Sequence, residues 1–207
     1  MINLFLSHFQ KNEVNPILSI NSSSLSVKRP LKIVFTGPES SGKTTTTRLA
    51  AKHFNTYWLS EYSRTYLNKL NRSYVVSDLV KIAEGQLSSE REFEQYHTTQ
   101  AYLFYDTSLL VIKVWSIFKY GFYNFELERL LRQNLPDIFF LCDWNIPWEF
   151  DPMRENPNER NILYHLYKKE LAELNIPFFE LKGTTTERLM CIKKTLQNID
   201  NELNTKN

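Results

Sequence analysis

The sequence contains little cysteine and no long apolar run. Its 207 residues include only two cysteines, Cys142 and Cys191, with neither a CxxC pair nor a Cys/His cluster. This pattern argues against a disulfide framework and against a structural zinc site. No apolar stretch approaches the roughly 18 residues that a membrane helix needs, and the opening MINLFL has no basic segment before it. We therefore expect a cytoplasmic protein with reduced thiols and no membrane partner.

The chain also lacks a strong charge of one sign. It carries 25 Lys and Arg against 23 Asp and Glu, a formal net charge of +2. This balance provides no broad cationic field for duplex nucleic acid, although local clusters can still bind a small anion. Hydrophobic residues make up 42% of the chain and aromatic residues 14%, enough for a core. We expect one folded domain that binds no nucleic acid.

The organisation of the chain changes near residue 31. Residues 1–30 hold a Ser/Asn-rich stretch without a sustained period, and we expect a loosely ordered leader or a short helix there. Residues 31–207 alternate apolar strand candidates with helical spacing, beginning with a strand, a glycine loop and a helix over 43–54. The alternation predicts an α/β fold, a P-loop NTPase-type three-layer sandwich with a five-stranded parallel sheet. The expected strands are 31–36, 56–60, 101–105, 137–141 and 177–181.

One glycine loop carries the clearest chemical signal. Residues 37–44 read Gly-Pro-Glu-Ser-Ser-Gly-Lys-Thr, which satisfies G-x-x-x-x-G-K-[ST] between an expected strand and helix. Such a loop points backbone N–H groups at phosphate oxygens, while the helix dipole favours the same charge. Lys43 would reach the β- and γ-phosphates, and Thr44 would bind Mg²⁺. The expected ATP contacts are Gly37, Glu39, Ser40, Ser41, Gly42, Lys43, Thr44, Thr45 and, further along the chain, Arg160.

Two acidic residues stand where expected strands end, beside that loop. Asp106 follows an apolar strand, the place of a second Mg²⁺ ligand, although it could equally open the next helix. Glu61 ends the second strand and can accept the proton of an acceptor hydroxyl. Arg64, one turn later, can stabilise a transferred phosphoryl group or simply pair with Glu61. We expect either Glu61 or Asp106 to be the catalytic base, and Gln86 either binds the acceptor or lies on a solvated helix face.

A long polar segment, residues 143–160, follows the fourth expected strand. It is too polar for the core and too long for a tight turn, so we interpret it as a lid over the site. Lids of phosphoryl-transfer enzymes supply arginine to the transition state, and Arg154 and Arg160 are the candidates. Trp148 could stack on a substrate ring or pack the loop down.

Several short motifs occur together in one order. They are the phosphate loop, Glu61-Tyr62-Ser63-Arg64, Gly85-Gln86, Tyr105-Asp106-Thr107, Pro147-Trp148, Asp151 and Arg154. Over roughly residues 31–200, their order and spacing resemble the nicotinamide riboside kinase domain of NadR-type proteins. The resemblance implies a standalone P-loop kinase that transfers phosphate from ATP, with Mg²⁺, to the 5′-hydroxyl of nicotinamide riboside. It implies catalytic roles for Lys43, Glu61, Asp106 and Arg154, and acceptor contacts from Glu61, Arg64, Gln86, Asp106 and Trp148.

The chain departs from that family in three ways. It lacks the His-x-Gly-His signature and helix-turn-helix often joined to such kinases, so we expect neither adenylyl transfer nor transcriptional repression. Pro152 follows Asp151 where the family tends to have glycine, and Ser108 stands where a second carboxylate is expected. Two alternatives therefore remain: a kinase for another nucleoside or small alcohol, or a P-loop ATPase or switch.

Overall fold

The computed structural model describes residues 29–205, so the expected leader over 1–30 lies almost wholly outside the described residues. Five parallel strands form one sheet in the order β2-β3-β1-β4-β5, which confirms the expected α/β fold. The strands are β1 (Leu31–Thr36), β2 (Trp58–Leu59), β3 (Tyr102–Asp106), β4 (Ile138–Cys142) and β5 (Phe178–Leu181).

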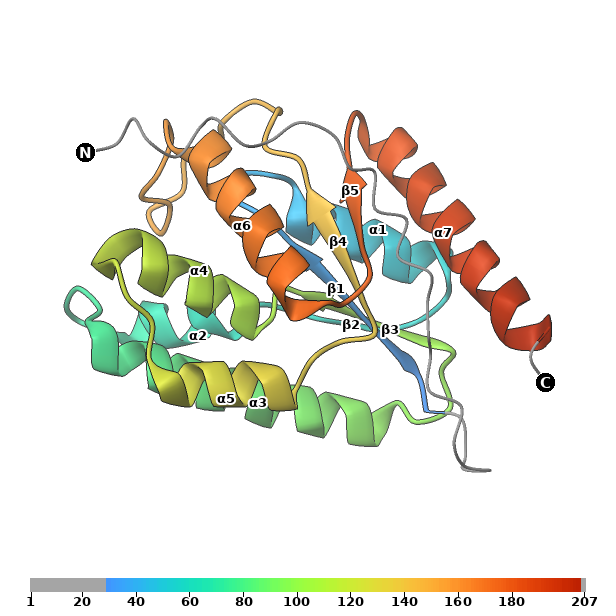
Figure 1. Cartoon of the computed structure of the whole chain (residues 1–207), viewed down its shortest axis with the longest axis horizontal. Coiled ribbons are helices and arrows are strands. Elements are labelled where there is room, and N and C mark those ends of the chain that lie inside the picture. Colours follow the sequence, from blue (N-terminus) through green and yellow to red (C-terminus); the bar gives the residue numbers. More distant parts are fainter. Residues whose placement is uncertain (1–28, 206–207) are drawn as a thin grey trace.

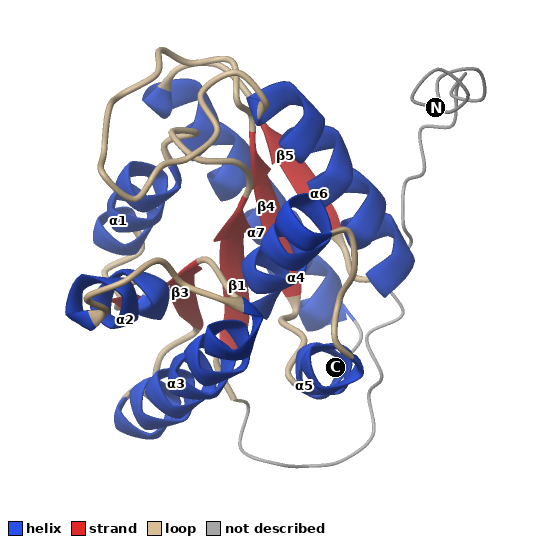
Figure 2. Ribbon diagram, turned by 90° about the vertical axis from the view of Figure 1, so that its left-hand side faces the viewer, coloured by secondary structure: helices blue, strands red, loops and turns tan. Residues whose placement is uncertain are grey.

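Seven helices in the described part of the chain connect these strands and cover both faces of the sheet (Figures 1 and 2). Helices α1 and α7 pack on one face, whereas α3, α4, α5 and α6 contribute to the core on the other. The expected three-layer sandwich is thus confirmed. The helices are α1 (Lys43–His53), α2 (Tyr62–Lys69), α3 (Val76–Tyr96), α4 (Leu109–Tyr120), α5 (Phe125–Gln133), α6 (Arg160–Leu174) and α7 (Thr185–Thr205).

The central strand β1 explains why the sheet is stable between two helical layers. Its residues Ile33, Val34 and Phe35 are completely buried although they point to alternate faces. A continuous apolar run of this kind is typical of a parallel strand covered on both sides. On the α1/α7 face, Phe35 packs against Phe140 with ring centroids 5.4 Å apart and against Phe104 at 5.8 Å. These aromatic contacts hold the three central strands together.

The order of the strands places the functional loops. Strand β1 lies between β3 and β4 and runs parallel to both, so the carboxyl ends of these three strands lie side by side. Ligands of open α/β sheets bind in the crevice at the carboxyl ends of the strands where the direction of winding reverses. The glycine loop follows β1, Asp106 ends β3, and the segment after β4 begins at Asp143.

Reciprocal hydrogen bonds cap the start of α7, and one strand is shorter than expected. The capping box before α7 is present: Glu187 accepts a hydrogen bond from the Thr184 backbone N–H at 2.7 Å, and its own N–H donates to the Thr184 hydroxyl at 3.3 Å. Strand β2 has two residues rather than the five expected over 56–60. It lies at the edge of the sheet, where one neighbour, β3, provides its only pairing within the described residues.

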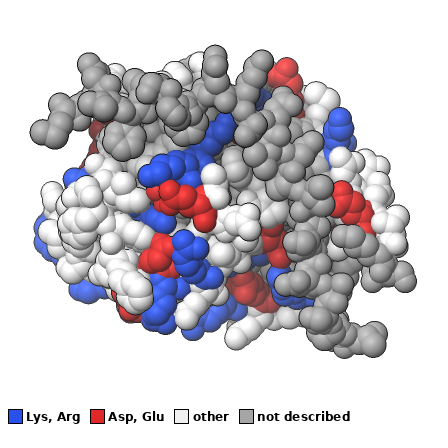
Figure 3. All heavy atoms as spheres, viewed as in Figure 1, with Lys and Arg blue, Asp and Glu red and all other residues white. Residues whose placement is uncertain are grey.

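The surface reflects the near-equal numbers of acidic and basic residues in the sequence. Acidic and basic side chains of the described residues lie interspersed on the face drawn in Figure 3. None of the helices within residues 29–205 combines the length and apolar character needed to span a bilayer.

A close contact with α3 fixes the position of α2, the helix whose N-cap is Glu61. A Cβ atom added to Gly85 would lie 2.1 Å from the Cε1 atom of Tyr62, so only glycine lets this ring cross α3. Gly85→Ala should therefore lower the free energy of unfolding by about 1–3 kcal/mol through overpacking, although alanine is the better helix former.

Chemical denaturation of Gly85→Ala and of Ser88→Ala, an exposed position on the same helix, tests this contact. Ser88→Ala should leave stability unchanged or slightly higher. A Gly85→Ala protein as stable as the wild type would show that Tyr62 is not constrained by the contact.

Candidate active site

The glycine loop after β1 is shaped by two residues that need a left-handed backbone. Gly37 has a φ of 134°, and a Cβ atom there would lie 2.7 Å from the carbonyl oxygen of Cys142. Gly42, with a φ of 76°, is the N-cap of α1. A side chain at either position would be strained, because both residues have a positive φ. At Gly37 it would also collide with β4. The loop therefore runs close to β4 and ends at the positive end of the α1 dipole.

The carbonyl groups of this loop are bound by cationic side chains. Lys43 donates from Nζ to the carbonyl oxygens of Gly37 at 3.0 Å and Pro38 at 2.8 Å. Arg160 donates to the carbonyl oxygen of Ser40 at 3.2 Å, and Arg188 to that of Ser41 at 2.6 Å. Because C=O and N–H point in opposite directions across a trans peptide, the N–H groups of Ser41 and Gly42 point away from these arginines. Such a set of N–H groups forms a site for an anion.

Thr44 and Asp106 form the part of the site that suits a magnesium ion. The Thr44 hydroxyl donates to Oδ2 of Asp106 at 2.5 Å, while the buried Oδ1 atom has no hydrogen-bond partner among the described residues. Burial raises the pKa of Asp106, and the Thr44 hydrogen bond and nearby Lys43 partly oppose this effect. A hydroxyl, an unpartnered carboxylate oxygen and phosphate oxygens are the ligands that Mg²⁺ uses in nucleotide sites. The residues present therefore fit the ion.

Glu61 faces the same cleft from the start of α2. Its Oε1 atom accepts a hydrogen bond from the Ser63 hydroxyl at 2.5 Å. Burial raises the pKa of Glu61, whereas Lys43 and the Ser63 hydroxyl act to lower it. A carboxyl group with a raised pKa is a stronger base when ionised and titrates nearer neutral pH. Glu61 is thus suited to accept a proton in the cleft.

The cleft is a single hollow of about 400 Å³ that joins the loop to Glu61. The phosphate loop and the turn over residues 183–185 line one part of it. The wall on the other part is apolar and aromatic, and its residues come from four separate segments of the chain. These residues are Leu67, Val111, Trp115, Met153, Leu163 and Tyr167.

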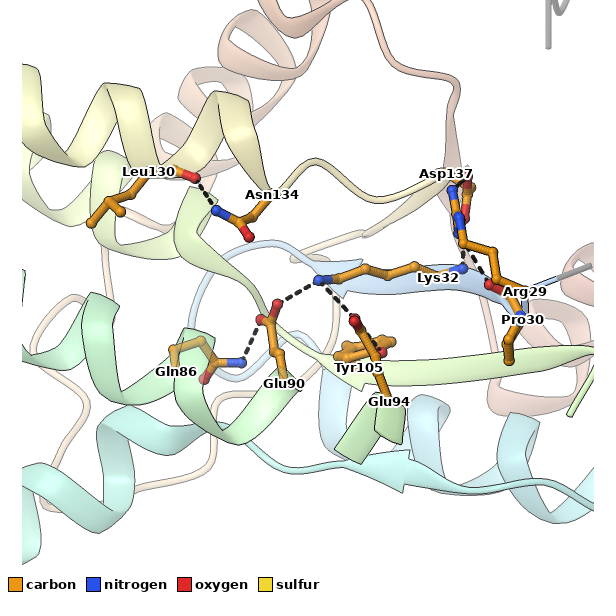
Figure 4. Close-up of polar contacts among 10 residues, drawn as sticks. All are labelled: Arg29, Pro30, Lys32, Gln86, Glu90, Glu94, Tyr105, Leu130, Asn134 and Asp137. Atoms are coloured by element: carbon orange, nitrogen blue, oxygen red, sulfur yellow. Dashed lines mark hydrogen bonds and ion pairs between the residues drawn. The ribbon is translucent and has the colours of Figure 1, made fainter. Parts of the chain in front are cut away.

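Gln86 does not line this cleft. Its amide forms hydrogen bonds elsewhere, and Figure 4 draws the one with Glu90. Its Oε1 atom accepts from the Tyr62 backbone N–H at 3.0 Å, and its Nε2 atom donates to Glu90 at 2.8 Å. Glu90 in turn forms an ion pair with Lys32 of β1. This arrangement differs from both expected roles, acceptor contact and solvated helix face, because the buried amide ties the start of α2 to α3. Gln86 therefore positions the helix that follows Glu61.

The expected lid over residues 143–160 is an irregular segment, drawn in gold at the top of Figure 1, that contacts the phosphate loop. The hydroxyl of Ser40 accepts from the Glu149 backbone N–H at 2.9 Å and from Arg154 at 3.4 Å. Glu39 accepts from the backbone N–H of Asn156 at 3.0 Å. Arg154 also lines the cleft. The structure thus places Arg154 beside the phosphate loop.

The same segment is also bound on the side of α2 and α4. Arg64 of α2 forms an ion pair with Asp151 at 2.9 Å, and Glu155 forms one with Lys119 at 3.1 Å. The Met153 backbone N–H and Arg64 hold the pKa of Asp151 below its usual value. Arg64 therefore pairs with the lid rather than with Glu61, the pairing that the sequence left open. Contacts on both sides close the segment over the cleft.

Trp148 and Arg160 lie outside the cleft lining. The Arg160 guanidinium lies 5.5 Å from the Trp148 ring centroid and 6.0 Å from that of Trp144. It donates to the carbonyl oxygens of Trp144 and Ile146 as well as to that of Ser40. Of the two roles considered for Trp148, the structure favours packing of the loop. Arg160 holds the phosphate loop from outside, so its expected direct contact with ATP has no support in this arrangement.

Arg188 is a residue of the site that the sequence analysis missed. It is 3% exposed, lines the cleft and donates to backbone carbonyl groups of three different loops. No local motif marks Arg188, because all of its partners are backbone carbonyl groups. Those of Ser41 and Asp143 are distant in sequence, and that of Gly183 lies in the turn before α7.

A loop that presents backbone N–H groups, an adjacent lysine and a Thr/Asp pair define the nucleotide site of a P-loop protein. A family model described as AAA domain matches residues 32–188. The chain belongs to this AAA-domain family. No curated protein matches its sequence.

Solved structures of nucleotide-handling proteins share the fold. A crystal structure of NadR protein in complex with NR has a TM-score of 0.67 and 21% sequence identity, covering 81% of this chain and 49% of that chain. Thymidylate kinase from Ehrlichia chaffeensis has a TM-score of 0.61 and 16% identity, covering 82% and 100%. Deoxyadenosine kinase from M. mycoides has a TM-score of 0.53 and 13% identity, covering 81% and 100%. The chain thus spans about half the length of the NadR chain that it matches.

The Thr44–Asp106 pair generates a prediction about magnesium. Asp106→Asn keeps the shape of the side chain but removes its charge, so it should weaken Mg²⁺-dependent ATP binding by roughly 10–100-fold. Binding of ATP in the presence of EDTA should change little, because the loop N–H groups are untouched. Calorimetric titration with and without Mg²⁺ measures both values.

Asp143→Asn is the matched control, since Asp143 follows β4 and its side chain does not line the cleft. Equal Mg²⁺-dependent affinity in Asp106→Asn and the wild type would exclude Asp106 as a contributor to the metal site.

Proposed function

We propose that this protein is an ATP-dependent kinase that phosphorylates the 5′-hydroxyl of nicotinamide riboside and produces nicotinamide mononucleotide. The observation that carries the proposal is the shared cleft: the phosphate loop and the carboxyl group of Glu61 line one hollow of about 400 Å³. That volume accommodates a donor phosphate chain next to a small acceptor. The likeness in fold to NadR bound to NR supports this choice of acceptor.

The charges of the cleft favour an acceptor without a phosphate group. Its four cationic lining residues are Lys43, Arg64, Arg154 and Arg188. Lys43 and Arg188 donate to loop carbonyl groups, Arg154 contacts Ser40, and Arg64 is paired with Asp151. Within the described residues, no cation of the lining faces the acceptor side without a partner. This favours a nucleoside over a nucleoside monophosphate, which would need a dedicated basic group.

The acceptor wall is suited to a flat, positively charged ring. Trp115 and Tyr167 provide aromatic surface, and Glu61 and Glu149 place carboxylates in the same cleft. The nicotinamide ring of the riboside carries a positive charge, which aromatic faces and carboxylates both attract. A neutral purine or pyrimidine nucleoside gains only the apolar part of this interaction.

Each residue has a separable task in the proposed transfer. Lys43 and the N–H groups of residues 39–44 would bind and orient the triphosphate. Thr44 with Asp106 would hold Mg²⁺, which neutralises charge on the phosphate oxygens. Since Asp106 would be occupied by Mg²⁺ together with Thr44, we assign proton acceptance from the 5′-hydroxyl to Glu61. Arg154 would stabilise the transferred phosphoryl group from the lid. The lid excludes water that would otherwise hydrolyse ATP.

The assay with nicotinamide riboside and MgATP should yield a monophosphate detectable by mass spectrometry. Glu61→Gln should lower kcat by roughly 10²–10⁴-fold, because it removes the base, and should leave the KM for ATP nearly unchanged. A wild-type enzyme that phosphorylates another nucleoside but not nicotinamide riboside would overturn the choice of acceptor.

The pH dependence of kcat tests the assignment of Glu61 as the base, with Ser63, its hydrogen-bond donor, as the residue to substitute. Glu61 accepts a proton only when ionised, so activity should rise with pH through its pKa. Since the Ser63 hydrogen bond lowers that pKa, Ser63→Ala should move the acidic limb of kcat to higher pH. Identical acidic limbs in the wild type and Ser63→Ala would argue that another group is the base.

A further inference from the structure

The guanidinium group of Arg188 joins three loops at the donor end of the cleft. From α7 it donates to the carbonyl oxygens of Gly183 at 3.2 Å, Ser41 at 2.6 Å and Asp143 at 3.1 Å. Gly183 belongs to the turn before α7, Ser41 to the phosphate loop and Asp143 to the segment after β4. A single buried side chain therefore fixes the relative positions of the loops around the donor site.

The positive charge of Arg188 has no acidic partner. Among the described residues, its polar contacts are all with backbone carbonyl groups, and no ion pair connects it to a carboxylate. A buried cation without a counter-charge is costly, and carbonyl dipoles compensate only part of that cost. Because Arg188 lines the cleft, a bound anion would complete the compensation.

The contact with Ser41 also sets the direction of one loop N–H group. The peptide between Ser41 and Gly42 is trans, so its N–H group points away from the arginine that binds its C=O group. A Cβ atom added to Gly42 would lie 3.3 Å from the Nη1 atom of Arg188, so the loop and the guanidinium are closely packed. Lysine has no planar fork and cannot bind three carbonyl groups in this arrangement.

We propose that Arg188 is a positioning residue for the donor polyphosphate, which orients the Ser41–Gly42 peptide toward the phosphates and supplies a buried positive charge at the donor end. The inference deepens the proposed function by adding a determinant of donor binding. It requires a polyphosphate donor but makes no assumption about the acceptor.

Calorimetric titration of the full chain with MgATP and with MgADP tests the proposal. Arg188→Met should weaken MgATP binding by roughly 10- to 100-fold, the effect of losing charge-assisted hydrogen bonds. The loss should be larger for MgATP than for MgADP, because the triphosphate carries more negative charge. In steady-state assays the KM for ATP should rise, while the KM for the acceptor stays unchanged.

Two further variants separate this role from general loss of structure. Arg129→Met removes the same group from an exposed ion pair on α5 and should retain wild-type affinity. Arg188→Lys keeps the charge but not the fork, so it should fold, as shown by circular dichroism, and still bind MgATP at least several-fold more weakly. If Arg188→Met fails to fold, Arg188→Lys alone decides the question.

Wild-type MgATP affinity in Arg188→Lys or Arg188→Met, or an equal rise of both KM values, would overturn the proposal. These results are distinct from a failure of the proposed function, because calorimetry needs no acceptor. A wild-type protein that does not phosphorylate nicotinamide riboside, yet shows the Arg188-dependent binding of MgATP, would refute the acceptor and support the role of Arg188.

Discussion

The site depends on the direction of the peptide groups between residues 37 and 44. Lys43, Arg160 and Arg188 bind carbonyl oxygens of this turn, so the N–H groups of Ser41 and Gly42 point to the other side. An anion-binding loop needs this separation, because carbonyl oxygens beside a phosphate would repel it. The two arginines come from α6 and α7, and the loop conformation therefore requires the complete fold rather than the local sequence alone.

The fold also explains how distant residues reach the same cleft. Strand β1 lies between β3 and β4, so the phosphate loop, Asp106 and the lid emerge at one edge. Glu61 follows the short edge strand β2, and the buried chain of Lys32, Glu90 and Gln86 connects the start of its helix to β1. This connection gives the proposed base and the phosphate loop a common support. It uses side chains that never line the cleft.

Much of this arrangement could be predicted from the sequence, for reasons that differ between residues. The phosphate loop is local in sequence, so its pattern and its place after an apolar strand identified it. Roles set by tertiary contacts could not be predicted: glutamine is a residue type usually exposed on helices, but both ends of the Gln86 amide are bound, by Tyr62 and Glu90. Arg160 was expected at ATP and instead binds carbonyl groups of the loop and lid. Arg188 has no motif, because backbone carbonyl groups are present at every residue.

Binding of MgATP to the wild-type protein tests the central claim most directly. Calorimetric titration should show one site per chain for MgATP, and titration with adenosine under the same conditions should give much weaker binding, because the loop N–H groups and Lys43 act on the phosphates. Equal affinity for adenosine and MgATP, or no heat of binding with MgATP, would contradict the account.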